Sequence, residues 1–228
     1  MKSRLVTPSL APILVSVFLF SGGCTRNETV IGTEQIVGSG RIISETRGAP
    51  AFTGIRVTNY ARVIITQDTV QSLRIEADDN ILNRVQSQVV GGILIVGMPE
   101  GSYNNVTVIV HAAFRNITLL ESTGAADFSV TAPITANDLL CRITGAGSIA
   151  LDGWVSRETI EITGAGNVWN FGLAATTCSA LISGAGTIEV TVAQRLDATI
   201  LGTGSITYAG NPPVVNRSVM GVGSIKPL

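Results

Sequence analysis

The chain has 228 residues, of which 45% are hydrophobic and only 14% are charged, and its net charge is −1. This balance excludes a strongly basic nucleic-acid-binding protein, because neutralising phosphates requires clustered lysines and arginines. The apolar content also excludes a disordered acidic chain. The single histidine, His111, argues against His-based metal sites and catalytic triads. We therefore expect no metal and no cofactor.

Residues 1–23 have the three parts of an export signal, namely basic residues, an apolar stretch and small residues before a cysteine. The apolar stretch, residues 5–20, contains two prolines and is shorter than the roughly 20 residues that a membrane-spanning helix needs. A cysteine directly after small residues resembles the lipidation box of bacterial lipoproteins, although Leu is missing three places before it. We expect lipid attachment at Cys24, with an ordinary cleaved signal as the alternative. Residues 24–40 are polar and are expected to form a tether.

A glycine-centred motif recurs six times from residue 122 onward, each copy resembling Ile143-Thr-Gly-Ala-Gly-Ser-Ile149. The first glycines of the copies are Gly124, Gly145, Gly164, Gly184, Gly202 and Gly221. A period of about 20 residues, with short runs of Ile, Val and Thr, is typical of a β-solenoid whose coils stack about 4.8 Å apart. The sequence thus predicts an all-β domain over residues 41–228, with regular coils from residue 122.

The alternation of side chains along each strand assigns the motif positions to faces. The residues two places before the first glycine should form an inward ladder, as should those four places after it. The first ladder comprises Ile143, Ile162, Ile182, Ile200 and Val219. The positions next to it, Thr144, Thr163 and Ser183, should face solvent. The glycines should mark a narrow corner where Cβ atoms would collide and where a positive φ is available.

The cysteines Cys141 and Cys178 both fall on inward positions, two coils apart. That separation is about 10 Å along the stack, whereas a disulfide needs Cα atoms within roughly 7 Å. The sequence therefore predicts two free, buried thiols.

The first half is less regular, and short strands are expected over residues 52–57, 61–65, 73–77, 92–96, 105–110 and 116–120. Composition does not change before residue 122, so we expect looser coils of the same body. His111 is expected to be an ordinary strand-face residue in this half.

Several features together resemble one bacterial family, the "putative auto-transporter adhesin, head GIN domain" family. They are the lipoprotein-like leader, Phe52-Thr-Gly-Ile-Arg-Val57, Gly91-Gly-Ile-Leu-Ile95 and the serial Gly-x-Gly-x-Ile/Val motifs. The resemblance covers about residues 50–226. It implies a right-handed parallel β-helix in an exported or surface lipoprotein, and it brings no catalytic residues.

We therefore expect a non-enzymatic lipoprotein of the cell envelope, anchored in the outer membrane, that presents its surface to a glycan, another surface or an envelope protein. The candidate ligand face comprises Trp154, Trp169, Thr144, Thr163 and Ser183. One alternative is a polysaccharide lyase or hydrolase on the same scaffold. Hydrolysis needs two carboxylates about 5–9 Å apart. The acidic residues of the repeat region in this chain, however, occupy different repeat positions and form no obvious pair. A structural envelope component without a ligand is the other alternative.

Overall fold

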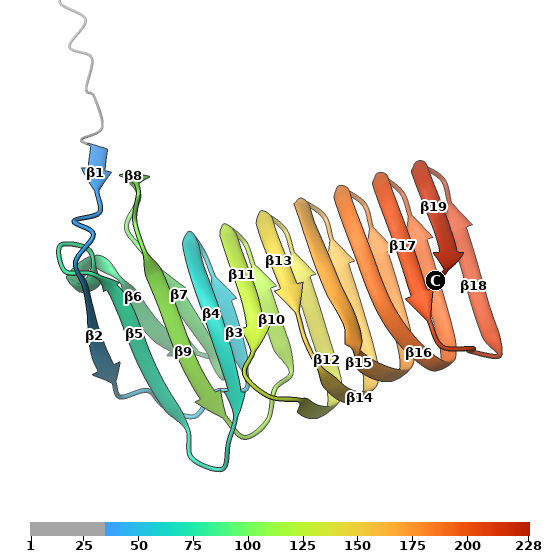
Figure 1. The fold of residues 1–228 in the computed structure, drawn as a ribbon, viewed down its shortest axis with the longest axis horizontal. Helices are drawn as coiled ribbons and strands as arrows, with labels where there is room; N and C mark the ends of the chain where they lie inside the picture. The colour runs from blue at the N-terminus through green and yellow to red at the C-terminus, as the bar shows by residue number, and fades with distance from the viewer. Residues whose placement is uncertain (1–34) are drawn as a thin grey trace, which may run out of the picture. The chain divides into compact units, whose positions relative to one another are not determined.

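The computed structural model describes residues 35–228, which form a β-solenoid of stacked parallel coils (Figure 1). The predicted signal peptide, Cys24 and most of the predicted tether lie outside the described residues. Each regular coil has two arms, and between them the chain turns at the glycine motif. We call the arms that precede this turn the front sheet and those that follow it the back sheet.

The front sheet is, in spatial order, β6 (Gln86–Val90), β7 (Ile93–Gly97), β3 (Gly54–Val57), β10 (Leu119–Ser122), β12 (Ile134–Ile143), β14 (Gly153–Ile162), residues 173–182 of β15 (Ala165–Ile182), residues 191–200 of β16 (Ala185–Ile200) and β18 (Val214–Val219). The back sheet is β2 (Ile42–Arg47), β5 (Ser72–Asp78), β9 (Val108–Phe114), β4 (Tyr60–Gln67), β11 (Ala125–Val130), β13 (Ala146–Ala150), the first parts of β15 and β16, β17 (Thr203–Ala209) and β19 (Val222–Pro227).

The N-terminal end is closed by antiparallel strands. β6 pairs with β7 on the front sheet, and β2 and β5 extend the back sheet beyond β9. A short 3-10 turn, η1 (Leu82–Arg84), and a small separate ladder of β1 (Gln35–Val37) with β8 (Ser102–Asn104) complete this end. β1 lies within residues 24–40, which were expected to be a tether. This part of the segment forms a strand instead, because β8 supplies hydrogen-bonding partners for its backbone.

The coils of the first half do not stack in sequence order. The chain makes β3 and β4, then leaves to build β5 to β9, and returns with β10 and β11 on the other side of β3 and β4 (Figure 1). The coil of β3 and β4, which comes first in the chain, is therefore inserted between the coil of β7 and β9 and the coil of β10 and β11. The strands expected from the sequence are present here with shifted ends, but this order was not predicted, because a repeat pattern indicates neighbours only where the repeat is regular.

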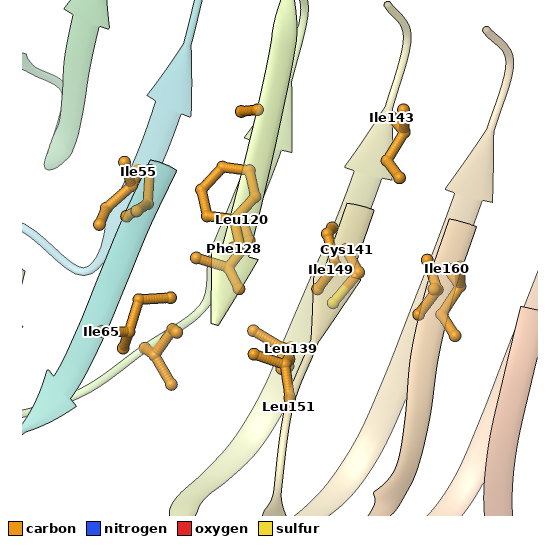
Figure 2. Close-up of a cluster of buried hydrophobic side chains, with 14 of the residues drawn as sticks. Ile55, Ile65, Leu120, Phe128, Leu139, Cys141, Ile143, Ile149, Leu151 and Ile160 are labelled. Carbon is orange, nitrogen blue, oxygen red and sulfur yellow. The ribbon is translucent and has the colours of Figure 1, made fainter. Parts of the chain in front are cut away.

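Both predicted ladders line the interior between the two sheets. Ile143, Ile162, Ile182 and Ile200 are fully buried and in register on successive front strands. Phe128 and Ile149 begin the second ladder on the back sheet, and Figure 2 shows their side chains together with Leu120 and Cys141 in the same layer. The prediction fails at Val219, which has an inward register but is 44% exposed, because β18 pairs on one side only among the described strands.

The glycines are required mainly by the close approach of adjacent coils at the corner. A Cβ on Gly164 would lie 2.0 Å from the carbonyl oxygen of Gly145, and a Cβ on Gly184 would lie equally close to that of Gly164. Among the glycines of the repeated motif, the expected positive φ occurs only at Gly147, at 125°. The corner therefore selects glycine by backbone contact along the stack, and conformational freedom contributes at one position.

Cys141 and Cys178 are free and buried, as predicted. β14 lies between their strands, with Ile160 beside Cys141 and Glu158 beside Cys178. Within residues 35–228 no helix is long and apolar enough to cross a bilayer.

Candidate functional site

Trp169 stands on the outer surface of the back sheet beside a shallow hollow. Its side chain is 42% exposed, and its register neighbours on the adjacent strands are Ala150 and Glu189. The hollow has a volume of about 660 Å³, and its floor contains Gly147 and Gly166. Because the repeat places small residues at the same register on each coil, the indole rises above a flat area that a partner can reach.

The polar groups of this hollow are held in fixed positions. The Ser148 hydroxyl donates to Asp127 Oδ1 at 2.6 Å, and Asn167 Oδ1 accepts the Thr187 backbone N–H at 3.1 Å. Ser148, Asn167 and Thr187 occupy one register on three successive strands. The back sheet therefore presents a rigid row of polar side chains next to one aromatic side chain, an arrangement suited to contact with a polar surface.

The predicted hydroxyl column lies elsewhere, at the glycine corner. Thr144, Thr163 and Ser183 are exposed, and each backbone N–H donates to the preceding coil at 2.9 Å. The Thr144 hydroxyl folds back toward the Ser122 carbonyl at 3.4 Å. In the next two coils the position is occupied by Leu201 and Met220, which are 45% and 72% exposed, so the column is polar over three coils only.

Trp154 is in a third place, near the start of a front-sheet strand. It is 44% exposed and in register with Thr135 and Ala174. The five residues of the candidate ligand face thus belong to the back sheet, the glycine corner and the front sheet. The two tryptophans lie on different sheets and do not form one platform.

A row of alternating charges crosses the outer surface of the front sheet. Arg56, Glu121, Arg142 and Glu161 occupy one register on successive strands. Arg56 Nε lies 2.7 Å from Glu121 Oε2, and Arg142 Nε lies 2.7 Å from Glu161 Oε2. Each of these carboxylates is paired with a guanidinium, so the row neutralises itself and presents little net charge to a partner.

A buried polar cluster lies inside the solenoid, and sequence reasoning missed it. Glu158 and Asn170 are both fully buried. Asn170 Nδ2 donates to Glu158 Oε1 at 2.5 Å, while Asn170 Oδ1 accepts the Leu151 N–H at 3.0 Å. Glu158 Oε2 makes no hydrogen bond of good geometry within the described chain. Glu158 is six places before Gly164, as Cys178 is before Gly184, so the same counting would have marked it as inward.

Burial governs the proton affinities in this cluster. It raises the pKa of Glu158 to about 7, and hydrogen bonding with Asn170 and the nearby Cys178 thiol offsets part of that effect. Burial, assisted by the Glu158 charge, also raises the pKa of Cys141 and of Cys178 well above the ordinary thiol value. These groups are closed off from solvent, and the thiols are held in the protonated, unreactive form. The cluster is therefore a feature of the core and not a candidate active site.

His111 lies on β9 as a strand-face residue, with Nε2 3.3 Å from Glu76 Oε1 and its side chain 29% exposed. Among residues 35–228, His, Cys, Asp and Glu side chains form no group that could hold a metal ion.

Residues 51–212 match the model of the family described as "putative auto-transporter adhesin, head GIN domain". A putative adhesin from Bacteroides fragilis has a similar structure, with a TM-score of 0.69 and 22% identity, over 85% of this chain and 100% of that one. A putative lipid binding protein from Parabacteroides distasonis has a TM-score of 0.53 and 21% identity, over 86% and 100%. No match was found among curated proteins.

The fold and these comparisons define the class of protein as a β-solenoid. The family match spans more than half of the chain, and the chain therefore belongs to the head GIN domain family of putative auto-transporter adhesins. The similarity to the two solved structures extends to the fold.

Proposed function

We propose that this protein is a non-enzymatic, exported lipoprotein that uses the Trp169 side of its back sheet to adhere to another surface of the cell envelope. The observation that carries this proposal is the half-exposed indole beside a flat hollow on a rigid parallel sheet. The family description supports a role in adhesion. The export signal expected over residues 1–23 and the cysteine that follows it, Cys24, support attachment to the outer membrane by lipid.

A flat, shallow site suits adhesion better than catalysis. The hollow contains one carboxylate, Asp127, which is occupied by the Ser148 hydroxyl. Contacts on such a surface are individually weak, and many copies on one membrane would add avidity. The structural neighbour described as lipid binding does not change this proposal, because buried aliphatic side chains fill the interior of the described coils.

The proposal is tested with beads that carry the purified protein and with cell envelopes isolated from the producing bacterium. We expect Trp169→Ala to reduce bead attachment severalfold, since exposed tryptophans contribute strongly to interfaces. Tyr60→Ala is the matched control, because Tyr60 is a similarly exposed aromatic residue outside the hollow. In cells, Cys24→Ala should release the protein from membranes. Equal attachment by the Trp169→Ala protein and the unmodified protein would refute the proposed face.

A further inference from the structure

The corner opposite the glycine corner contains a groove that is distinct from the Trp169 hollow. Here the chain passes from the back sheet to the front sheet, through residues 115–118 in one coil and residues 131–133 in the next. The groove has a volume of about 360 Å³. A smaller hollow of about 310 Å³ adjoins it and shares Thr53 and Asn116 with it.

The floor of this corner groove is apolar and its walls are polar. Ile117 and Ala136 are buried and form the floor, whereas Asn116, Thr135 and Asn137 are exposed on the walls. The burial pattern explains the wall: Asn137 and Asp138 are both exposed, between the buried residues Ala136 and Leu139. This interruption of the alternation adds an amide and a carboxylate to a surface that strict alternation would not provide.

The wall amides have unused hydrogen-bonding capacity. Neither the Asn116 side chain nor the Asn137 side chain makes a hydrogen bond to another residue of the described chain. Each amide can donate two hydrogen bonds and accept two. Thr118, in contrast, is tied to Thr53 at 3.1 Å and helps to fix the shape of the groove.

The groove is close to electrically neutral and has an aromatic residue beside it. Asp138 Oδ1 accepts a hydrogen bond from Arg157 Nη1 at 2.5 Å, which balances its charge. Trp154 is the register partner of the wall residue Thr135 on the adjacent strand, about 4.8 Å away. An exposed indole ring therefore stands on the strand next to the groove wall that carries Thr135 and the free Asn137 amide.

We propose that this corner groove binds a neutral oligosaccharide. Sugar rings present hydroxyls that both donate and accept, which match asparagine amides and threonine hydroxyls, and they present apolar C–H faces that stack on aromatic rings. A charged ligand would find no net complementary charge in the groove. This inference deepens the proposed function, because it names the chemical class that an adhesive surface would recognise, but it uses a different site from the Trp169 hollow.

The test is calorimetric titration of the purified protein with neutral hexaoses, namely cellohexaose, mannohexaose and xylohexaose, up to about 5 mM. We expect at least one hexaose to bind. Asn116→Ala and Asn137→Ala should each weaken that binding about fivefold or more, because each removes hydrogen bonds to the sugar. Trp154→Ala should weaken it by a similar factor.

Asn104→Ala and Tyr60→Ala are the matched controls, because both residues are exposed and lie outside the groove. They should bind the sugar as the unmodified protein does, and circular dichroism should show that all variants are folded. The inference is overturned if no hexaose binds, if the groove variants bind as well as the controls, or if acidic hexagalacturonate binds better than every neutral hexaose. Bead attachment that persists in any of these cases would leave the adhesion proposal standing, and its loss in Trp169→Ala alone would separate the two sites.

Discussion

At the scale of single residues, Glu158 is the position where the sequence departs most from what the fold requires. It occupies an inward ladder position between Leu139 and Cys178. A carboxylate loses its hydration there, and one hydrogen bond from Asn170 replaces only part of it. The core accommodates the group by raising its pKa, which connects its protonation to the stability of the fold.

Glu158→Gln is expected to remove a pH-dependent loss of stability. The ordinary carboxyl pKa of 4.5 rises to about 7 in the folded protein. Below about pH 4.5 the carboxyl is protonated in both the folded and the unfolded state, and the free energy of unfolding is not reduced. As pH rises to about 7 the unfolded chain ionises first, so the free energy of unfolding falls, by up to roughly 3 kcal/mol. Glutamine keeps the shape without the charge, so urea unfolding at pH 8 should show the variant to be more stable than the wild type.

The same comparison at pH 4.5 should show a much smaller difference. Glu100→Gln, at an exposed turn, controls for the loss of one negative charge. Equal stability of the wild type and Glu158→Gln at pH 8 would contradict the account of this buried acid.

At the scale of elements, the coil is defined by its glycine corner. Successive corners approach so closely that the backbone of one coil occupies the space where a side chain of the next would begin. Each corner also supplies hydrogen bonds along the stack, such as Thr163 N–H to Ile143 O and Ala165 N–H to Gly145 O. The corner thus fixes the spacing of coils as well as the direction of the chain.

Gly164→Ala is expected to destabilise the protein by about 3 kcal/mol, because the new methyl group would lie 2.0 Å from Gly145 O and one coil would have to move. Gly48→Ala is the matched control: nothing lies within 4 Å of its Cβ position, and its φ suits alanine. Thermal unfolding should place the Gly48→Ala variant at or slightly above the wild type. An equally small effect of both substitutions would mean that the corners are not held by backbone contact.

The regular coils could be predicted because each carries the same pattern at the same period. Ladder positions such as Ile182 and Ile188 follow from alternation alone, and both are buried. The interrupted alternation in β12 could not be predicted in this way, because no glycine or proline marks it at Asn137 and Asp138. The corner groove depends on that interruption, and its residues come from three segments brought together by stacking. Trp169 was expected on the candidate ligand face, but the small residues that surround it come from neighbouring coils and could be recognised only in the stacked structure.

At the scale of the whole molecule, the order of the coils determines how firmly each coil is held by its neighbours. From β12 onward each coil contacts its sequence neighbours, as in a linear repeat array. The coil of β3 and β4 is instead held between strands that come from later in the chain, on both sides and in both sheets. Releasing it requires breaking the ladders with β7 and β9 and also those with β10 and β11.

Hydrogen exchange of the native protein should therefore be slowest in β3 and β4. Opening this coil exposes fully buried Ile55 and Val63 and disrupts two neighbouring coils at once, so its amides should exchange only when the whole body unfolds. The amides of β18 and β19, whose described pairing is on one side, should exchange at least about a hundredfold faster. Strands β12 and β14 provide internal reference rates between these limits. If β3 and β4 exchanged as fast as β19, the inserted coil would not be the most firmly held part of the molecule.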